Sequence, residues 1–234
     1  MKIYTSIFAA VLFLFSFNSF SQTTSNEHDT QFWNETTLSF PIYKVKDGSG
    51  KKTEKLSGLF SGNLRIGQNS RHFADERIGF GLELKINKYL SVSPSYLYRA
   101  GQPTKNKKEY EHRVRFDINL EKKFKYFSLK DRNRIEYRIR NSKDDTTRYR
   151  NKFQLKVPIK YGDNKELFAP FVADEPYYDF RQDTWFRNEF SVGISKKLNK
   201  STSADFFYMI QSNKNVTTLK QVDIFGINLK FKID

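Results

Sequence analysis

Charged and apolar residues alternate over two neighbouring segments in the middle of the chain, residues 131–140 and 148–159. Because successive side chains of a β-strand point to opposite faces, each segment predicts a strand with one charged face and one largely apolar face. Residues 141–145, between the segments, have the composition of a turn. The two strands therefore form a hairpin whose faces meet two different environments. The charged faces carry Arg132, Arg134, Glu136, Arg138 and Arg140 on the first strand and Arg148, Arg150, Lys152, Gln154 and Lys156 on the second.

The same alternation recurs along the rest of the chain, and no segment has the pattern of an amphipathic helix. It predicts eleven strands, at residues 32–43, 56–66, 77–86, 90–99, 110–121, 131–140, 148–159, 167–180, 185–198, 204–210 and 225–233. The facing of the 167–180 segment stays open, because acidic and aromatic residues interrupt its alternation.

The connections between these strands alternate in length. Those at 87–88 and 199–200 are minimal, whereas those at 67–75, 101–109, 141–147 and 213–218 are longer. Bacterial outer-membrane barrels have short periplasmic turns, longer external loops and an even number of strands. We therefore predict an all-β fold, an antiparallel transmembrane β-barrel of 10–12 strands with a polar, basic lumen. Because such barrels have an even number of strands, we expect the count of eleven to be wrong by one, and we favour twelve strands over ten.

A soluble, lipocalin-like barrel produces the same alternation with its apolar side turned inward, so alternation alone leaves both architectures open. Two further observations favour a barrel with lipid outside. Eleven apolar strand faces would supply far more core than a small soluble barrel can hold. The 23 phenylalanines and 13 tyrosines of the chain fall repeatedly at strand ends, which is typical of the aromatic girdles of membrane barrels.

The N-terminus predicts a secretory signal peptide, with a lysine at position 2, an apolar run from Ile7 to Phe17 and small residues before Gln22. The run is only about half of the roughly 20 apolar residues that a spanning helix needs. We expect residues 1–21 to be the signal peptide, 22–31 an N-terminal tail and 32–234 the barrel domain. The expected location is the bacterial cell outer membrane. The expected partners there are outer-membrane lipids, lipopolysaccharide and the outer-membrane assembly machinery.

The composition limits the chemistry further. The chain has 41 lysines and arginines against 26 aspartates and glutamates, a net charge of +15, and no cysteine. The absence of cysteine excludes disulfides, thiolate metal sites and a lipid-modified N-terminal cysteine. A basic cytosolic chain would suggest nucleic acid, but an exported one meets anionic headgroups, glycans or solutes. We therefore expect small anionic solutes as partners and no nucleic acid.

Four stretches of the sequence resemble domain-of-unknown-function family 2490 (DUF2490): residues 132–138, 148–158, 171–180 and 187–200. The resemblance extends over nearly the whole mature chain. It implies a bacterial outer-membrane β-barrel with no assigned activity. The glutamine directly after the expected cleavage site is similar to that of exported proteins of the Bacteroidetes group.

Acid–base chemistry has few candidates, because the chain contains only His28, His72 and His112. A histidine beside a serine on the lipid-facing side would be typical of a lipid-modifying outer-membrane enzyme, and this alternative stays open. His112, however, has the parity of a lipid-facing residue near a rim, which favours an interfacial role. No phosphate-binding loop, metal-ligand spacing or nucleotide motif is present. We expect no catalytic residue, no metal and no cofactor, and we interpret the protein as a non-enzyme.

The charged strand faces predict a basic row inside the lumen. Pairing the two central strands symmetrically about residue 144 places Arg138 opposite Arg150 and Arg140 opposite Arg148. A comparable pairing with the preceding strand brings Arg115 beside Arg138. Like charges directly opposite one another are destabilising, so such a row calls for an explanation.

Two explanations of the basic row stay open. In one, the arginines line a small pore for anionic solutes; in the other, acidic residues neutralise them and plug a structural or adhesive barrel. Further candidates to neutralise the row are Glu121, Asp174 and Glu189. The candidate lumen residues are the basic side chains Arg115, Arg138, Arg150, Arg134, Arg140 and Arg148 and the acids Glu111, Asp117 and Glu136.

Overall fold

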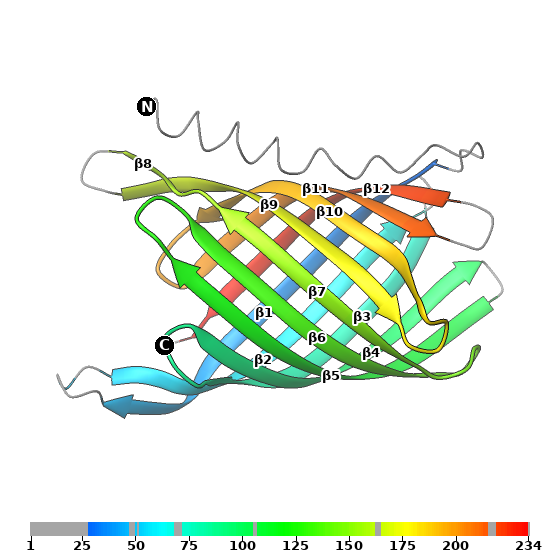
Figure 1. The fold of residues 1–234 in the computed structure, drawn as a ribbon, viewed down its shortest axis with the longest axis horizontal. Coiled ribbons are helices and arrows are strands. Elements are labelled where there is room, and N and C mark those ends of the chain that lie inside the picture. The colour runs from blue at the N-terminus through cyan, green and yellow to red at the C-terminus, as the bar shows by residue number, and fades with distance from the viewer. Residues whose placement is uncertain are drawn as a thin grey trace.

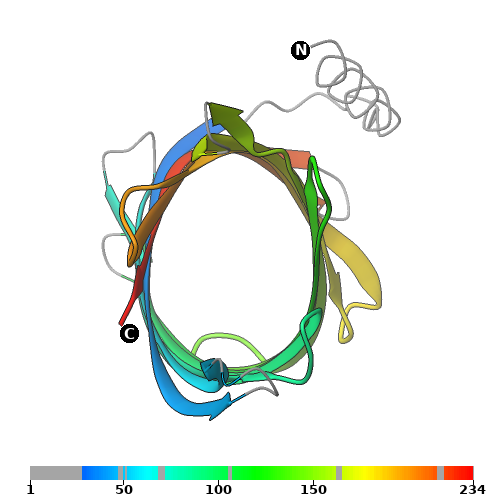
Figure 2. The same ribbon diagram turned by 90° about the vertical axis from the view of Figure 1, so that its left-hand side faces the viewer.

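The computed structural model describes residues 28–46, 50, 52–67, 72–104, 107–161, 165–214 and 219–233. These residues form one sheet that curves into a closed barrel (Figures 1 and 2). Its strands are β1 (His28–Lys46), β2 (Lys52–Gly67), β3 (His72–Lys85), β4 (Leu90–Thr104), β5 (Lys107–Lys123), β6 (Ser128–Arg140), β7 (Thr146–Lys156), β8 (Ile159–Tyr161), β9 (Lys165–Asp179), β10 (Thr184–Lys197), β11 (Thr202–Lys214) and β12 (Leu219–Lys232). The predicted all-β barrel is confirmed. No helix of the described part is long and apolar enough to cross a membrane.

The barrel closes through an unusual seam. Each strand pairs with its neighbour in an antiparallel ladder, except that β12 pairs with β1 in parallel. The short β8 continues β7 beyond Pro158 and pairs with β9 alone, so eleven of the twelve strands close the barrel. This agrees with the predicted range of 10–12 strands. The parity argument for an even number does not apply, because a parallel seam allows an odd number of strands to close.

The barrel wall begins earlier in the chain than the sequence pattern indicated. β1 starts at His28, so residues 28–31, which we expected to belong to a tail, are part of the sheet. The expected signal peptide, residues 1–21, and the tail up to residue 27 lie outside the described residues. The side chains of His28 and His72 also lie outside the described part.

The two faces of the wall differ as the alternation predicted. Large apolar side chains are exposed on the outside, whereas charged side chains such as Glu111 and Glu136 are buried on the inside. A lipocalin-like barrel would have the opposite arrangement, so that alternative is wrong. Examples of exposed outer residues are Ile78, Phe80, Val114, Phe116, Ile135 and Phe225.

A small apolar cluster lies on the inner side of the seam. Trp33 of β1, Met209 of β11, and Val222 and Ile224 of β12 are buried together, and Phe207 packs against them. Both strands of the parallel pair contribute to this cluster. Parallel pairing is slightly less stable per residue than antiparallel pairing, so buried apolar contacts on this seam help to hold the barrel closed.

The packing of Phe207 depends on a glycine, which yields a first prediction. A Cβ added at Gly226 would clash with the Phe207 ring, whereas nothing lies within 4 Å of a Cβ added at Gly62. We expect Gly226→Ala to lower the free energy of unfolding by about 1–3 kcal/mol, because overpacking forces side chains out of their rotamers. Denaturant unfolding of the refolded barrel in detergent measures this.

Gly62→Ala is the matched control, and its effect should stay within about 0.5 kcal/mol. Adding Phe207→Leu to Gly226→Ala should recover part of the loss, because the two residues are in contact. Equal effects of the two glycine substitutions would contradict this account of the seam.

Candidate functional site: the charged lumen

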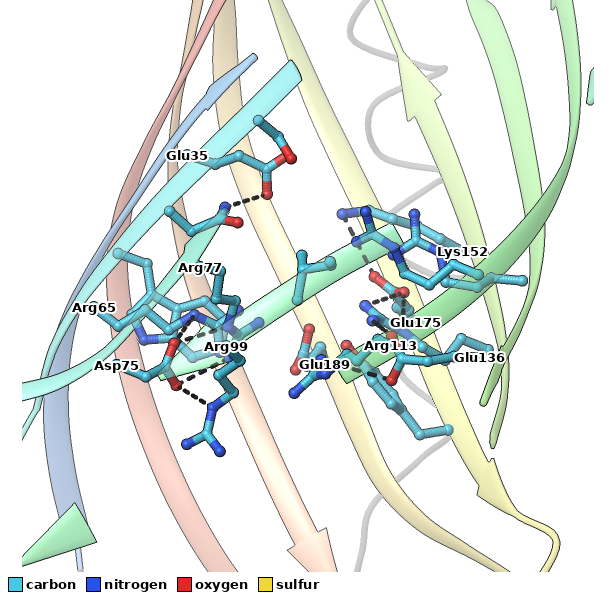
Figure 3. A pocket seen from close by; sticks show the side chains of 18 of the residues that line it. Glu35, Arg65, Asp75, Arg77, Arg99, Arg113, Glu136, Lys152, Glu175 and Glu189 are labelled. Carbon is cyan, nitrogen blue, oxygen red and sulfur yellow. Dashed lines mark hydrogen bonds and ion pairs between the residues drawn. The ribbon is translucent and has the colours of Figure 1, made fainter. Parts of the chain in front are cut away.

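A cavity of about 1150 Å³ lies inside the barrel (Figure 3). All nine candidate lumen residues line it, namely Arg115, Arg138, Arg150, Arg134, Arg140, Arg148, Glu111, Asp117 and Glu136. The alternation of side chains is therefore sufficient to predict which of these residues face inward.

The lining is basic. It contains seventeen lysines and arginines but only eleven aspartates and glutamates, an excess of six positive charges. Because a low-dielectric wall surrounds the cavity, this excess acts on any ion inside it more strongly than the same charges on an open surface would.

The register of the central hairpin differs from the symmetric pairing. β6 and β7 pair with Arg138 opposite Thr146 and Glu136 opposite Arg148, so the pairing centres on residue 142 and not on residue 144. The turn explains the difference: β6 continues to Arg140 beside β5, and the Asp145 carboxylate accepts a hydrogen bond from the Arg140 N–H at 3.0 Å. The predicted pairing was wrong because the turn is asymmetric.

The expected basic row is therefore corrected. Arg115 lies opposite Glu136, and Arg138 lies opposite Arg113, so Arg115 and Arg138 occupy different rows of the sheet. Arg150 lies opposite Arg134 in a third row. A register shift by an even number of residues changes the partners of a strand but not the face of its side chains, which is why the residues still line the lumen.

Two buried glutamates connect β4, β5, β6 and β7. Glu111 accepts hydrogen bonds from Arg113 at 2.8 Å and from Arg138, and lies 3.7 Å from Arg99. Glu136 lies 3.6 Å from Arg113, 3.7 Å from Arg138 and 3.9 Å from Arg150. Each carboxylate thus stands among three guanidinium groups, and this relieves the repulsion that the arginines would otherwise exert on one another.

A third glutamate, Glu175 of β9, extends the network. It contacts Arg132 and Arg150 at 2.7 Å each, and Lys152 at 3.7 Å. The sequence pattern left the facing of this strand open. The structure turns Glu175 inward, so that it neutralises part of the charge of β6 and β7.

Asp75 of β3 forms a further centre, which lies apart from Glu136 and Glu175 (Figure 3) and is linked to Glu111 through Arg99. Its carboxylate lies 2.8 Å from Arg77, 3.1 Å from Arg99 and 3.9 Å from Arg65. The guanidinium of Arg65 also lies over the ring of Trp33, 3.3 Å from the ring centroid. Sequence reasoning missed this centre, because Asp75 falls in an expected loop, although the parity of Arg65 and Arg77 indicated the lumen.

The remaining candidates have simpler surroundings. Asp117 binds Arg134 in a bidentate pair with both distances at 2.6 Å. Arg115 donates from Nε to the Ser95 hydroxyl at 3.1 Å. Arg148 pairs with Asp179 at 3.0 Å and lies over the ring of Phe186. Arg140 donates to the carbonyl oxygen of Asp144 in the turn that follows β6.

The other acidic residues that we expected to neutralise the lumen differ in where their side chains lie. Glu189 of β10 faces inward and lies 3.9 Å from Arg187. Glu121 pairs with Lys123 through exposed side chains, and Asp174 lies on the outward parity of β9, beside the inward Glu175. The expectation that Asp174 neutralises the lumen is therefore wrong.

The exposure of the charged side chains determines whether the cavity presents mainly positive or mainly negative charge to a solute. The side chains of Glu111, Glu136 and Glu175 are only 2–3 % exposed. The basic partners of Glu111 and Glu136 are 8–17 % exposed, and Arg132 and Lys152, which pair with Glu175, are 22 % and 31 % exposed. The carboxylates thus lie at the wall with the basic groups in front of them, and a solute in the cavity meets mainly guanidinium and ammonium groups.

Aromatic side chains support several of these cations. The Arg150 guanidinium lies 4.2 Å from the ring centroid of buried Tyr177, and Arg187 lies 5.7 Å from the same ring. A cation over an aromatic face is attracted by the ring quadrupole without losing its charge. Such contacts orient guanidinium groups while leaving their N–H groups free for other partners.

The histidine with a described side chain lies outside the lumen. The phenol of Tyr96 hydrogen-bonds with Nδ1 of His112 at 2.5 Å, and the ring of Tyr98 packs beside it. Within the described ranges, no group of three or more acidic or histidine side chains is arranged to hold a metal ion.

Comparison with protein families finds a match over residues 30–222, to the model described as "Protein of unknown function (DUF2490)". The chain belongs to DUF2490. The match covers most of the barrel, from β1 into β12. Comparison with curated proteins finds no match for this DUF2490 chain.

Among solved structures, the DUF2490 barrel is similar to one described as "Anion-selective porin from Comamonas acidovorans". The two share 12 % sequence identity with a TM-score of 0.38, and the similarity covers 77 % of this chain and 57 % of the porin. The chain thus spans little more than half the length of the structure that it matches. A likeness of this extent carries no argument about function.

The network of the DUF2490 lumen yields a second prediction. Glu111→Gln removes one buried carboxylate and leaves Arg99, Arg113 and Arg138 short of a counter-charge. We expect the free energy of unfolding to fall by about 3–5 kcal/mol, as for other buried ion pairs that lose one partner. Chemical denaturation in detergent at low salt measures the change.

Glu121→Gln on the same strand is the matched control. Its carboxylate is exposed and pairs with the exposed Lys123, so its loss should change stability by at most about 1 kcal/mol. High concentrations of a small anion should reduce the deficit of the Glu111 variant. Similar effects at both positions would contradict the importance of the buried network.

Proposed function

We propose that the protein is an outer-membrane β-barrel whose basic lumen admits small anionic solutes. The closed sheet with its apolar exterior supports membrane embedding, because closure pairs the backbone groups that lipid cannot hydrogen-bond. The observation that carries the proposed passage is the layering of charge in the lumen, with arginines in front of buried carboxylates.

The chemistry of the lining favours anions with several oxygens. Arginine presents a planar fork of N–H donors that matches carboxylate and phosphate groups. Rings of basic side chains make a pore anion-selective. Acidic oligosaccharides or phosphorylated compounds are therefore the solute class that we propose.

The same contacts also support a competing function. Several carboxylates are each shared by three basic groups, which is what a plugged structural barrel would need. The excess of six positive charges in the lining favours the pore, since a network built only for stability has no need of surplus charge.

We further propose that the barrel has no catalytic activity. The His112 ring is engaged by Tyr96 and Tyr98 on the outer face, which supports an interfacial role. A lipid-modifying enzyme would instead hold a histidine against a nucleophile and its orienting group.

Membrane embedding is tested by fractionation and electrophoresis. The protein should need detergent for extraction, and unboiled and boiled samples should migrate differently in SDS gels, because a closed and fully paired sheet resists detergent. Release as a soluble protein without detergent would contradict the proposal.

The anion pathway is tested in planar bilayers under a salt gradient. We expect conductance with an anion-favouring reversal potential. Arg132→Gln, which removes one of the more accessible lumen charges, should reduce the ratio of anion to cation permeability about fivefold, corresponding to the roughly 1 kcal/mol between unit charges 4 Å apart in water.

Lys200→Gln is the control, because Lys200 lies in the exposed turn between β10 and β11 and does not line the cavity. It should leave the permeability ratio unchanged. Silent bilayers with correctly folded protein would support the plugged barrel, and a preference for cations would contradict the charge argument itself.

A further inference from the structure

Glu35 of β1 is a lumen acid that lies apart from the shared carboxylates. Its side chain is exposed to the cavity, away from the ion pairs around Asp75 and Glu136 (Figure 3). Its carboxylate accepts a hydrogen bond from Asn63 Nδ2 at 2.8 Å. Among the residues that the structure describes, no basic group lies within 4.0 Å of this carboxylate. Glu35 therefore offers a negative charge to the cavity.

Arg115 of β5 is the basic group that faces Glu35. Its Nε donates to the Ser95 hydroxyl at 3.1 Å, and no acidic side chain of the described ranges lies within 4.0 Å of its guanidinium. The side chain extends over β4 as far as β3, where a terminal nitrogen would lie 3.4 Å from a Cβ added at Gly79. Because Gly79 has no side chain, the inward position that it occupies is open to the guanidinium.

The strand register brings Glu35 and Arg115 close together. Glu35 lies opposite Asn63 of β2, and Ser61, the next inward residue of β2, lies opposite Gly79 of β3. A Cβ added at Gly79 would lie 2.8 Å from the Ser61 hydroxyl oxygen. The carboxylate and the guanidinium therefore lie over neighbouring inward positions of the wall, which are roughly 7 Å apart along a strand.

The two charged groups attract one another but do not form an ion pair. Coulomb attraction acts between Glu35 and Arg115 across the gap. Each group is instead held by a neutral partner, Asn63 in one case and Ser95 in the other. The gap between them thus has a negative end, a positive end and the Ser61 hydroxyl at its wall.

We propose that Glu35, Asn63, Ser61 and Arg115 form a subsite in the lumen for small solutes that carry both an ammonium group and a carboxylate, as acidic amino acids do. The ammonium group of the solute binds at Glu35. Its carboxylate binds at Arg115, whose planar fork of N–H donors suits that group.

This inference rests on the proposed admission of anionic solutes and narrows their class. The excess of six positive charges in the lining attracts an anion into the lumen. A simple dicarboxylate bound at Arg115 would then place its second carboxylate near Glu35, where like charges repel. An anion that also carries an amino group turns the same contact into an attraction.

The test compares glutamate with glutarate, which has the same two carboxylates but no amino group. Saturation-transfer NMR measures the dissociation constant of each solute for the refolded, full-chain barrel in an uncharged maltoside detergent. Glu35→Gln should raise the dissociation constant of glutamate about threefold to fivefold, the factor that an exposed ion pair supplies. The same substitution should lower the dissociation constant of glutarate or leave it unchanged, because it removes a repulsive charge.

Arg115→Gln is a second variant, and it should raise the dissociation constants of both solutes, since both use a carboxylate there. Glu121→Gln is the matched control. It removes the same charge from an exposed side chain of β5 that does not line the cavity, and it should leave both dissociation constants unchanged. Heat modifiability of each variant confirms that the barrel is folded.

Three outcomes would overturn the subsite: no binding of glutamate to the unaltered barrel, equal weakening of both solutes by Glu35→Gln, or glutamate binding that neither lumen substitution changes. Equal weakening would leave Glu35 with a purely structural role. Failure of the anion pathway is seen separately, because NMR binding does not require conductance. The expected binding pattern in a barrel that is silent in bilayers would overturn only the passage, and anion-selective conductance without the glutamate preference would overturn only the subsite.

Discussion

The sharing of buried carboxylates among arginines is the interaction on which the lumen depends. Closing the sheet brings the charged faces of neighbouring strands together, and this places Arg134 directly opposite Arg150 and Arg113 opposite Arg138. Each charge removed from water carries a desolvation penalty that only close counter-charges offset. Glu111, Glu136, Glu175 and Asp75 supply those counter-charges from the wall.

This arrangement links stability to the proposed function. Because the acids are short side chains held at the wall, they neutralise the arginines from behind. The more exposed basic groups, such as those of Arg132 and Lys152, remain accessible from the cavity. A lumen built in this way stabilises the barrel and also offers a surface to anions. The same residues therefore have a structural role and a proposed role in transport.

The outer face of the barrel wall differs from the lumen in the residues that it carries. Most outward positions are apolar, and the parallel seam between β1 and β12 is backed by the apolar cluster around Trp33 and Ile224. On the flank formed by β6, β7, β9 and β10, some outward positions instead carry polar residues, such as Asn133 and Asn151.

The sequence by itself determined the fold class and the facing of the side chains. A period of two is a local property of each strand, so the inward position of residues such as Arg115, Glu111 and Asp117 follows from counting along the chain. The family resemblance and the eleven strand segments could be read from the same local patterns. Polar residues at outward positions, such as Asn133 and Asn151, could be read there too, although their mutual contacts could not.

Only the tertiary structure decided the register, the closure and the contacts between distant strands. The asymmetric turn after Arg140 shifts β7 relative to β6. Arg115, Arg138 and Arg150 therefore lie in three different rows of the sheet and not in the single row that we expected. The parallel seam joins β1 to β12, and Glu175 reaches Arg132 from a strand more than forty residues away in the chain. Such pairings depend on how the whole sheet curves and closes, which no local pattern of residues encodes.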